Sequence, residues 1–310
     1  MDAAQSSGRQ AWAYLLLILS PLFMASNVVF GRDAVETVPP IGLAFWRWVL
    51  AFAILLPFAW PGLRRHGTSL LRAWPLLLVL GALGMGVCGA FVYIGLQHTT
   101  ATHAGLIYAA SPIFILIIGA VFIGERLSLI QCLGVVLAVF GVVVILTHGA
   151  PQQLLSFRVN VGDVWVLVAT VAWAVYSVLL KRKSLSVPTI PLFAAIALAG
   201  VICLAPFYVW ETLAGRPVVP TTDALTSVLA VAFIASVLAF GAYQQGIAVI
   251  GPSRAGMFMY LMPVYAALLA IVFLGERFEL FHLVGLGFIL PGLVLATLVP
   301  RWRWRLGRAA

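Results

Sequence analysis

Uninterrupted apolar runs dominate this sequence and restrict the folds that it can adopt. Most of the chain consists of stretches without Asp, Glu, Lys or Arg, and the longest extends from 73 to 124. A helix needs about 20 mostly apolar residues to cross the hydrocarbon core of a bilayer. Only 9% of the residues are charged, against roughly 25% in soluble domains. The sequence therefore predicts an all-α integral membrane protein, with no soluble domain left over.

Breaks in the apolar runs divide the chain into ten predicted transmembrane helices. The run 73–124 is too long for one helix, because a helix rises about 1.5 Å per residue, and the polar cluster Gln97–His103 marks its division. Pro, Gly and charge clusters mark the other boundaries. The predicted helices are 11–31, 39–60, 72–96, 102–124, 128–147, 162–181, 189–212, 224–249, 254–275 and 279–299.

Basic residues are distributed unequally between the two sides of these helices. With the N-terminus inside, the inside segments hold Arg9, Arg64, Arg65, Arg72, Arg126, Lys181, Arg182, Lys183, Arg254, Arg301, Arg303, Arg305 and Arg308. The outside segments hold Arg32, Arg158, Arg216 and Arg277. Cytoplasmic loops are enriched in Lys and Arg, so both termini are predicted to be cytoplasmic. The net charge of +9 then reflects membrane-flanking residues and indicates no nucleic-acid partner.

An internal repeat relates 104–146 to 255–297 at a spacing of 151 residues. The sequence thus predicts two five-helix repeats, 1–150 and 151–310, the second ending in a basic cytoplasmic tail. Because five is odd, the second repeat enters the membrane from the opposite side, and inverted repeats are typical of transporters. The matching residues include Ala104-Gly105 with Ala255-Gly256, Pro112 with Pro263, and Gly124-Glu125-Arg126 with Gly275-Glu276-Arg277.

Several of these features together resemble one transporter superfamily. They are Ser26-Asn27, Arg47, the stretch from Thr99-Thr100-Ala101 to Ser111-Pro112, and the two Gly-Glu-Arg turns. The chain resembles the drug/metabolite transporter superfamily in its ten-helix EamA-type branch, and is most similar there to bacterial exporters of amino acids, including aromatic ones. The resemblance implies a multi-pass protein of the bacterial inner membrane that works by alternating access without a cofactor.

The scarcity of charge inside the predicted helices narrows the substrate class. No Asp or Glu lies deep in any predicted span, which disfavours exchange of protons for cationic drugs, and a single intramembrane Arg suits phosphate poorly. We expect export of neutral amino acids, aromatic and aliphatic, by uniport. The alternatives are another small neutral metabolite or drug and, more distantly, an intramembrane enzyme or a sensor. The sequence shows no catalytic cluster for an enzyme.

Arg47 is the one basic residue placed well inside a predicted helix. It lies between Trp46 and Trp48 and could bind a substrate carboxylate. Alternatively, it pairs with backbone carbonyls or its side chain reaches the outer interface, while the tryptophans belong to the aromatic belt. Both interpretations remain open from the sequence.

Pro112 and Pro263 occupy equivalent positions and can act in two ways. Each removes a helical donor and so frees the carbonyl four residues earlier, at Tyr108 and Met259, to receive an ammonium group. Alternatively, each proline only kinks its helix. Glu125, Arg126, Glu276 and Arg277 are predicted to be structural, capping helix ends after a glycine.

Polar and aromatic residues within the predicted helices form a candidate substrate cavity. Buried amides and phenols need hydrogen-bonding partners, so some of them should face water or a ligand, although packing alone would also explain any single one. The three cysteines show no metal-ligand spacing and are interpreted as packing residues, and no metal site is predicted. The candidate substrate-binding residues are Asn27, Trp46, Arg47, Tyr93, Tyr108, Ser111, Trp173, Tyr176, Ser177, Tyr243, Gln244 and Tyr260.

Overall fold

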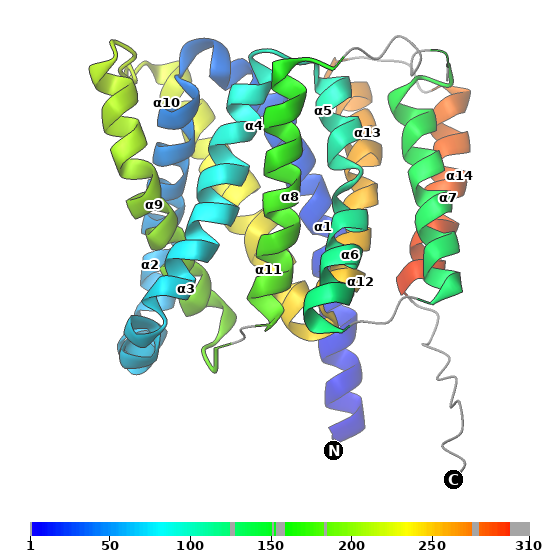
Figure 1. Cartoon of the computed structure of the whole chain (residues 1–310), viewed down its shortest axis with the longest axis horizontal. Coiled ribbons are helices and arrows are strands. Elements are labelled where there is room, and N and C mark those ends of the chain that lie inside the picture. The colour runs from blue at the N-terminus through cyan, green and yellow to red at the C-terminus, as the bar shows by residue number, and fades with distance from the viewer. Residues whose placement is uncertain are drawn as a thin grey trace.

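The chain forms a helical bundle, shown in Figure 1 from a computed structural model that describes residues 2–124, 128–150, 152, 159–182, 185–274 and 279–297. The described residues form helices and no strands. Glu125, Arg126, Glu276 and Arg277 lie outside the described residues. The helices are α1 (Asp2–Thr37), α2 (Pro40–Arg72), α3 (Trp74–Gly81), η1 (Ala82–Val87), α4 (Cys88–Leu96), α5 (Ala101–Tyr108), α6 (Ser111–Ile123), α7 (Leu129–Leu146), α8 (Val161–Arg182), α9 (Thr189–Leu213), α10 (Thr222–Ala230), η3 (Val231–Leu238), α11 (Ala239–Ile250), α12 (Pro252–Met257), η4 (Phe258–Leu261), α13 (Met262–Leu274) and α14 (Leu280–Thr297).

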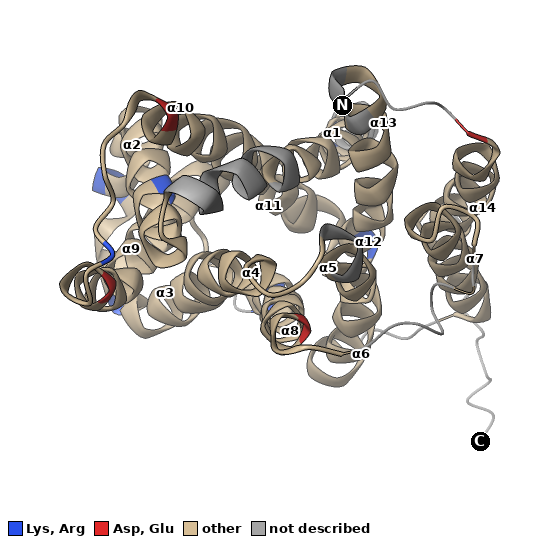
Figure 2. Cartoon of the chain, turned by 90° about the horizontal axis from the view of Figure 1, so that it is seen from above, with Lys and Arg blue, Asp and Glu red and all other residues tan. Residues whose placement is uncertain are grey.

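The prediction of an all-helical membrane protein is confirmed. In the described part of the chain, eight continuous helical segments are long and apolar enough to cross a membrane. Two further predicted spans correspond to α1 and to the interrupted segment α12–η4–α13. The count of ten spans therefore stays a prediction. Figure 2 shows the bundle from above, with few charged residues among its helices.

Several helices differ in length or continuity from the prediction. α2 continues to Arg72 although Pro57 and Pro61 lie within it, because a membrane helix tolerates proline when neighbours satisfy the freed carbonyls. The predicted helices 72–96 and 224–249 contain the wider π-helical turns η1 and η3. A two-residue turn at 109–110 separates α5 from α6, and Pro112 follows in the first turn of α6.

The helix boundaries recur at the same 151-residue spacing as the sequence repeat. α6 begins at Ser111 and α13 at Met262, and both are preceded by an interruption of the α-helix. α7 covers Leu129–Leu146 and α14 covers Leu280–Thr297. The π-helical segments also end at equivalent residues, Val87 and Leu238. Figure 1 shows equivalent helices with opposite directions: α1 runs upward from the N-terminus, whereas α8 runs downward.

Helices of the first half pack against helices of the second half throughout the bundle. α2 lies against α9, α7 against α14, α1 against α11 and η3, and α8 against α4 and η1. Figure 2 shows the α7–α14 pair at one edge of the bundle, and α2 and α9 at the opposite edge.

Glycines bring α7 and α14 into close backbone contact. A Cβ atom at Gly134 would lie 2.6 Å from the Gly292 carbonyl oxygen, and a Cβ atom at Gly292 would lie 2.6 Å from the Gly134 carbonyl oxygen. Gly141 and Gly285 form a second such pair, with separations of 2.5 and 2.9 Å. Because Gly134 is equivalent to Gly285, and Gly141 to Gly292, the interface has approximate two-fold symmetry. Small residues of this kind let membrane helices approach closely.

Two buried carboxylates stabilise helix ends near the upper end of the bundle. Glu211 of α9 is 5% exposed and accepts hydrogen bonds from the backbone N–H groups of Ile41 and Gly42, at 3.2 and 2.7 Å. The N-terminal N–H groups of a helix have no intrahelical partner, so Glu211 caps α2. Asp163 accepts a hydrogen bond from Thr99 and from the Asn160 backbone, and so joins α8 to the end of α4.

Replacing Glu211 with alanine should measurably destabilise the protein. The change leaves two backbone N–H groups of α2 without their acceptor, which costs about 1–3 kcal/mol for a buried group. We expect a lower apparent Tm in detergent. Asp223, exposed in the first turn of α10, provides a matched control, because its side chain has no such role and Asp223→Ala should leave the Tm within about a degree of wild type. Equal melting of both variants would contradict the capping role.

Candidate functional site

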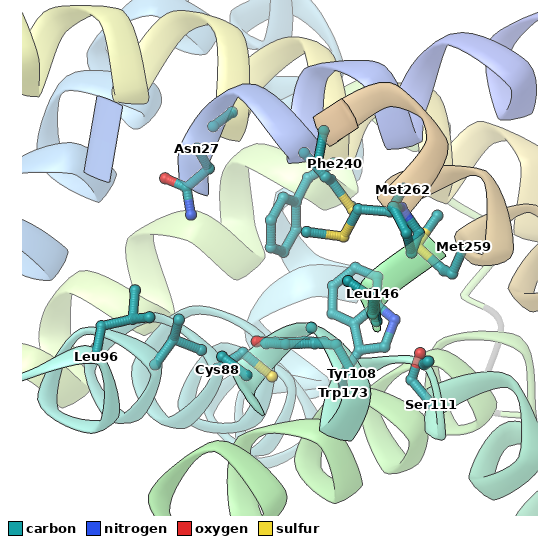
Figure 3. Close-up of a pocket in the computed structure, with 18 of the residues that line it drawn as sticks. Asn27, Cys88, Leu96, Tyr108, Ser111, Leu146, Trp173, Phe240, Met259 and Met262 are labelled. Atoms are coloured by element: carbon teal, nitrogen blue, oxygen red, sulfur yellow. The ribbon is translucent and has the colours of Figure 1, made fainter. Parts of the chain in front are cut away.

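A cavity of about 260 Å³ lies between the helices of the described bundle. Residues from both halves line it, and Figure 3 shows how their side chains converge from several helices. The volume lies just below the range of about 300–1,000 Å³ typical of pockets for drug-sized ligands, so it suits a small solute. Seven residues singled out from the sequence line it: Asn27, Arg47, Tyr108, Ser111, Trp173, Met259 and Pro263.

The walls of the cavity are largely apolar, and sequence reasoning missed most of them. Met262 is the repeat equivalent of Ser111, so the 151-residue spacing carried a signal that could have found it, as it found Met259. Phe240 carried none, because a phenylalanine in an apolar helix is unremarkable. Unbranched methionine side chains adapt readily to ligand shape. The unpredicted lining residues are Met24, Cys88, Val92, Leu96, Ala104, Gly105, Ala109, Leu146, Ala235, Phe240, Met262 and Ala266.

Arg47 is a buried cation that lines this cavity. Its side chain is 4% exposed and so does not extend to the surface of the bundle as snorkelling would require, whereas the alternative pairing with a backbone carbonyl is observed. Its Nε donates to Ser236 Oγ at 2.7 Å and its Nη2 to the Ala235 carbonyl at 3.4 Å. Both acceptors belong to η3, whose π-helical winding departs from the regular hydrogen-bonding pattern. The guanidinium also lies 4.9 Å from the ring centroid of Trp48 and 5.8 Å from that of Phe240.

Tyr93 and Asn27 hold the guanidinium from the other side. Arg47 Nη1 donates to the Tyr93 hydroxyl at 2.8 Å, and this hydroxyl donates to Asn27 Oδ1 at 2.9 Å. Tyr93 is fully buried behind Arg47 and does not line the cavity. Asn27 does line it, and Figure 3 shows its amide projecting from α1. The network therefore joins α1, α2, α4 and η3 around one charge.

Trp173 forms an aromatic wall, backed by residues that the sequence had placed in the cavity. Its ring lies 4.7 Å from that of Tyr243 and 5.1 Å from that of Phe240, centroid to centroid. Ser177 donates to the Trp173 carbonyl at 2.8 Å and its oxygen lies 3.3 Å from the Tyr243 hydroxyl. Ser177, Tyr243 and Tyr176 do not line the cavity in this structure, although each of them contacts Trp173.

Four other sequence candidates also lie away from the cavity. Trp46 is 38% exposed and donates through Nε1 to the Tyr208 hydroxyl at 3.1 Å. Adjacent helical residues point about 100° apart, so Trp46 and Arg47 cannot both face inward. Gln244 and Tyr260 are buried elsewhere, and Pro112 is buried in the first turn of α6.

Four buried polar side chains have no hydrogen-bond partner in the described structure: the Trp48 indole N–H, the Tyr176 and Tyr260 hydroxyls, and the amide of Gln244 at both of its polar atoms. Such groups are costly to leave unpaired, at about 1–3 kcal/mol each. Tyr176 lies one turn below Trp173 on α8, and Gln244 one turn below Phe240 on α11, in the orientation of Figure 1.

The carbonyls expected to be freed by proline behave differently in the two halves. The Met259 carbonyl accepts a hydrogen bond from the Met262 N–H. This is the i to i+3 bond of a 3₁₀ helix, the conformation of η4. The prediction that Met259 offers a free carbonyl is therefore wrong. The Tyr108 carbonyl lacks its α-helical donor because Pro112 has no N–H, and it remains a candidate acceptor.

The residues that line the cavity include the upper ends of α4 and α7, and α6 and α12 pack closely together in the lower half of the bundle. Leu96 and Leu146, the last residues of α4 and α7, line the upper part of the cavity. Below it, the α12 backbone at Gly256 packs against Ile115 of α6, so closely that a Cβ on the glycine would lie 2.8 Å from that side chain. Within the described residues no group of His, Cys, Asp or Glu could hold a metal ion.

An all-helical membrane bundle with a central cavity shared by both halves of the chain defines a transporter of small molecules. The model of the EamA-like transporter family matches residues 11–147 and again 160–298. The chain therefore belongs to the EamA-like transporter family, and two copies of the family unit cover most of its length.

Named relatives and a solved structure agree with this assignment. The chain is 26% identical to the transporter YetK of Bacillus subtilis, covering 94% of this chain and 88% of YetK. It is 27% identical to a probable terminal-alkyne amino-acid exporter of Streptantibioticus cattleyicolor, covering 93% of each. A crystal structure superposes with a TM-score of 0.74 at 24% identity, covering 94% of this chain and 97% of the other, which shows the same fold.

Proposed function

We propose that this protein exports neutral amino acids, aromatic and aliphatic, across the bacterial inner membrane by alternating access. The observation that carries the proposal is the central cavity itself, in which Arg47 faces walls formed by Trp173, Phe240 and methionines. A guanidinium binds a carboxylate through paired N–H donors, and the apolar walls suit apolar side chains. The similarity to a probable amino-acid exporter supports the same substrate class.

The proposed architecture is ten transmembrane helices in two inverted repeats, 1–150 and 151–310, with both termini in the cytoplasm. The recurrence of helix boundaries at 151 residues and the opposite directions of α1 and α8 support the inverted repeat. The lower ends of the described helices carry most of their basic residues, including Arg64, Arg65 and Lys181. The positive-inside rule then assigns the lower end to the cytoplasm.

The close packing of α12 against α6 in the lower half of the bundle supports alternating access. With the cytoplasm below, the ends of α4 and α7 that line the cavity lie toward the outside. The unpaired groups of Tyr176, Gln244 and Tyr260 would gain water when the lower half opens, which lowers the cost of the inward-open state. We propose that these three residues, together with Ser177 and Tyr243, line the inward-facing cavity, and that the breaks before Pro112 and Pro263 serve as hinges.

Uniport is the proposed mode of transport, because no Asp or Glu lines the described cavity. The buried carboxylates Glu211 and Asp163 cap helix ends instead. A second candidate function is export of another small neutral metabolite or drug, which the apolar walls favour. A sensor would bind the same ligands without net flux.

Proteoliposome transport tests the proposal directly. The purified protein is reconstituted and assayed for uptake and efflux of radiolabelled phenylalanine, threonine, methionine and a cationic drug, with and without a pH gradient. Saturable amino-acid flux that ignores the gradient is the expected result. Flux of the drug alone, driven by protons, would overturn both the substrate class and the uniport mode.

Cysteine labelling from one side of the membrane tests the orientation and the direction of the cavity. The variants Leu96→Cys, at the upper cavity, and Ser69→Cys, exposed near the lower end of α2, are made with Cys88, Cys132 and Cys203 replaced by alanine. In intact cells a membrane-impermeant maleimide should label Leu96→Cys and spare Ser69→Cys, and lysis should expose both. The reverse pattern would place the N-terminus outside.

A further inference from the structure

We infer that the cavity recognises the carboxylate of its substrate and does not require the amino group, so that it also takes apolar monocarboxylates such as N-acyl amino acids, 2-oxo acids and aryl alkanoates. The inference rests on the proposed transport function, because it concerns the same cavity. The observation behind it is that Arg47 and Asn27 have N–H donors that no described residue accepts from.

Arg47 retains two N–H donors after all its contacts in the described structure. A guanidinium has five N–H donors. One on Nε is bonded to Ser236, one on Nη1 to Tyr93, and one on Nη2 to the Ala235 carbonyl. One donor each remains on Nη1 and Nη2. A carboxylate can bridge two such donors in the bidentate manner that makes arginine–carboxylate pairs strong.

The charge of Arg47 is also not neutralised by the described residues. Its three hydrogen-bond acceptors are a hydroxyl, a phenol and a carbonyl, all of them neutral. No Asp or Glu lines the cavity. A buried cation without a counter-charge is unfavourable. An anionic group of the ligand would neutralise Arg47, and no carboxylate of the described residues competes with it for the guanidinium.

A substrate ammonium group finds no equivalent site in the described cavity. Asn27 Oδ1 and the Met259 carbonyl are neutral oxygens, and each already accepts one hydrogen bond, from Tyr93 and from Met262, which leaves one lone pair on each. The Tyr108 carbonyl and the hydroxyls are neutral acceptors too, so no acceptor in the described cavity carries the negative charge that would match an ammonium. Since an ion loses strong hydration on entering such a site, the ammonium contributes little net affinity, and near Arg47 it is repelled.

The amide of Asn27 offers a partner for a neutral oxygen instead. Its Nδ2 group, with two N–H donors, has no hydrogen-bond partner within the described structure, and the side chain projects toward the cavity. A carbonyl oxygen close to the carboxylate can accept from such a donor. A 2-oxo acid has one on the adjacent carbon, and an N-acyl amino acid has one on its amide group. The remainder of the ligand would contact Phe240, Trp173 and the methionines.

A set of ligands built on one phenyl group tests the inference by binding. Equilibrium binding of radiolabelled L-phenylalanine to the purified wild-type protein in detergent is competed with N-acetyl-L-phenylalanine, phenylpyruvate, 3-phenylpropionate, L-phenylalaninamide and phenethylamine. The three carboxylates without an amine should compete within about threefold of phenylalanine. The two amines without a carboxylate should be weaker by about 30-fold or more, because they lose the bidentate charge-assisted bonds. Direct binding of radiolabelled 3-phenylpropionate is measured in parallel.

The outcomes separate this inference from the proposed function. Binding and flux of 3-phenylpropionate without any phenylalanine flux would reject the amino-acid exporter and keep the carboxylate site. Phenylalanine flux with competition only by ligands that carry the amine would keep the exporter and overturn the carboxylate site. Absence of binding by every carboxylate would overturn both. In Arg47→Gln, the preference for 3-phenylpropionate over phenethylamine should disappear. If this variant does not fold, the competition series on the wild-type protein still tests the inference.

Discussion

Replacing Arg47 with glutamine is expected to lower the transport efficiency for phenylalanine, kcat/KM, by about 30-fold or more. The buried guanidinium is the only cation lining the described cavity, and glutamine removes the charge and the paired donors while keeping a polar side chain. Truncating one partner of a buried, hydrogen-bonded charge pair costs about 2–5 kcal/mol, and each 1.36 kcal/mol corresponds to a factor of about ten. Initial rates in proteoliposomes at several substrate concentrations give this ratio.

Arg64 provides a matched control on the same helix. Its side chain is exposed and lies 4.7 Å from the ring centroid of Trp60, away from the cavity. Arg64→Gln should therefore transport as the wild type does. Arg47→Lys keeps the charge but not the planar pair of donors, so its efficiency should lie between those of wild type and Arg47→Gln. If Arg47→Gln, folded and monodisperse, carried phenylalanine at the wild-type rate, the carboxylate role of Arg47 would be excluded.

The helices could be predicted from the sequence because a bilayer imposes a length and a polarity that composition records directly. Three helices begin and end within about two residues of their predicted limits, namely α7, α8 and α9. The extension of α2 through Pro57 and Pro61 could not be predicted, because neighbouring helices decide whether a proline ends a membrane helix. The π-helical turns in η1 and η3 are likewise set by tertiary packing and left no signal in the sequence.

The candidate site could be predicted only where a residue was conspicuous for its surroundings. Arg47 and Asn27 were found because polar groups inside a membrane helix need a partner. The same reasoning could not show that Tyr243 and Gln244 lie outside the cavity of this structure, because helical periodicity does not distinguish a face that lines a cavity from one that packs against another helix. Phe240 was missed for the converse reason, since apolar lining residues resemble apolar packing residues. The roles of all these residues in binding stay predictions until transport is measured.

Replacing Gly292 with leucine is expected to abolish the folded protein, because it would force α7 and α14 apart. A Cβ there would lie 2.6 Å from the Gly134 carbonyl oxygen and 2.7 Å from the Ala138 nitrogen. Both are backbone atoms, which cannot rotate away as a side chain can. Overpacking in a fitted core typically costs about 1–3 kcal/mol, and more when backbone must move. The yield of monodisperse protein and its apparent Tm in detergent measure the effect.

Gly287 makes the comparison specific, because it lies on the same helix with nothing within 4 Å of its Cβ position. Gly287→Leu introduces the same side chain on an exposed face and exchanges glycine for a better helix former, worth up to about 1 kcal/mol. This variant should be as stable as wild type or slightly more so. If neither variant yields folded protein, the added leucine interferes with insertion of α14 into the membrane and not with its packing against α7. Survival of both would mean that α7 and α14 do not pack through their glycines, and the approximate two-fold interface would then have to be abandoned.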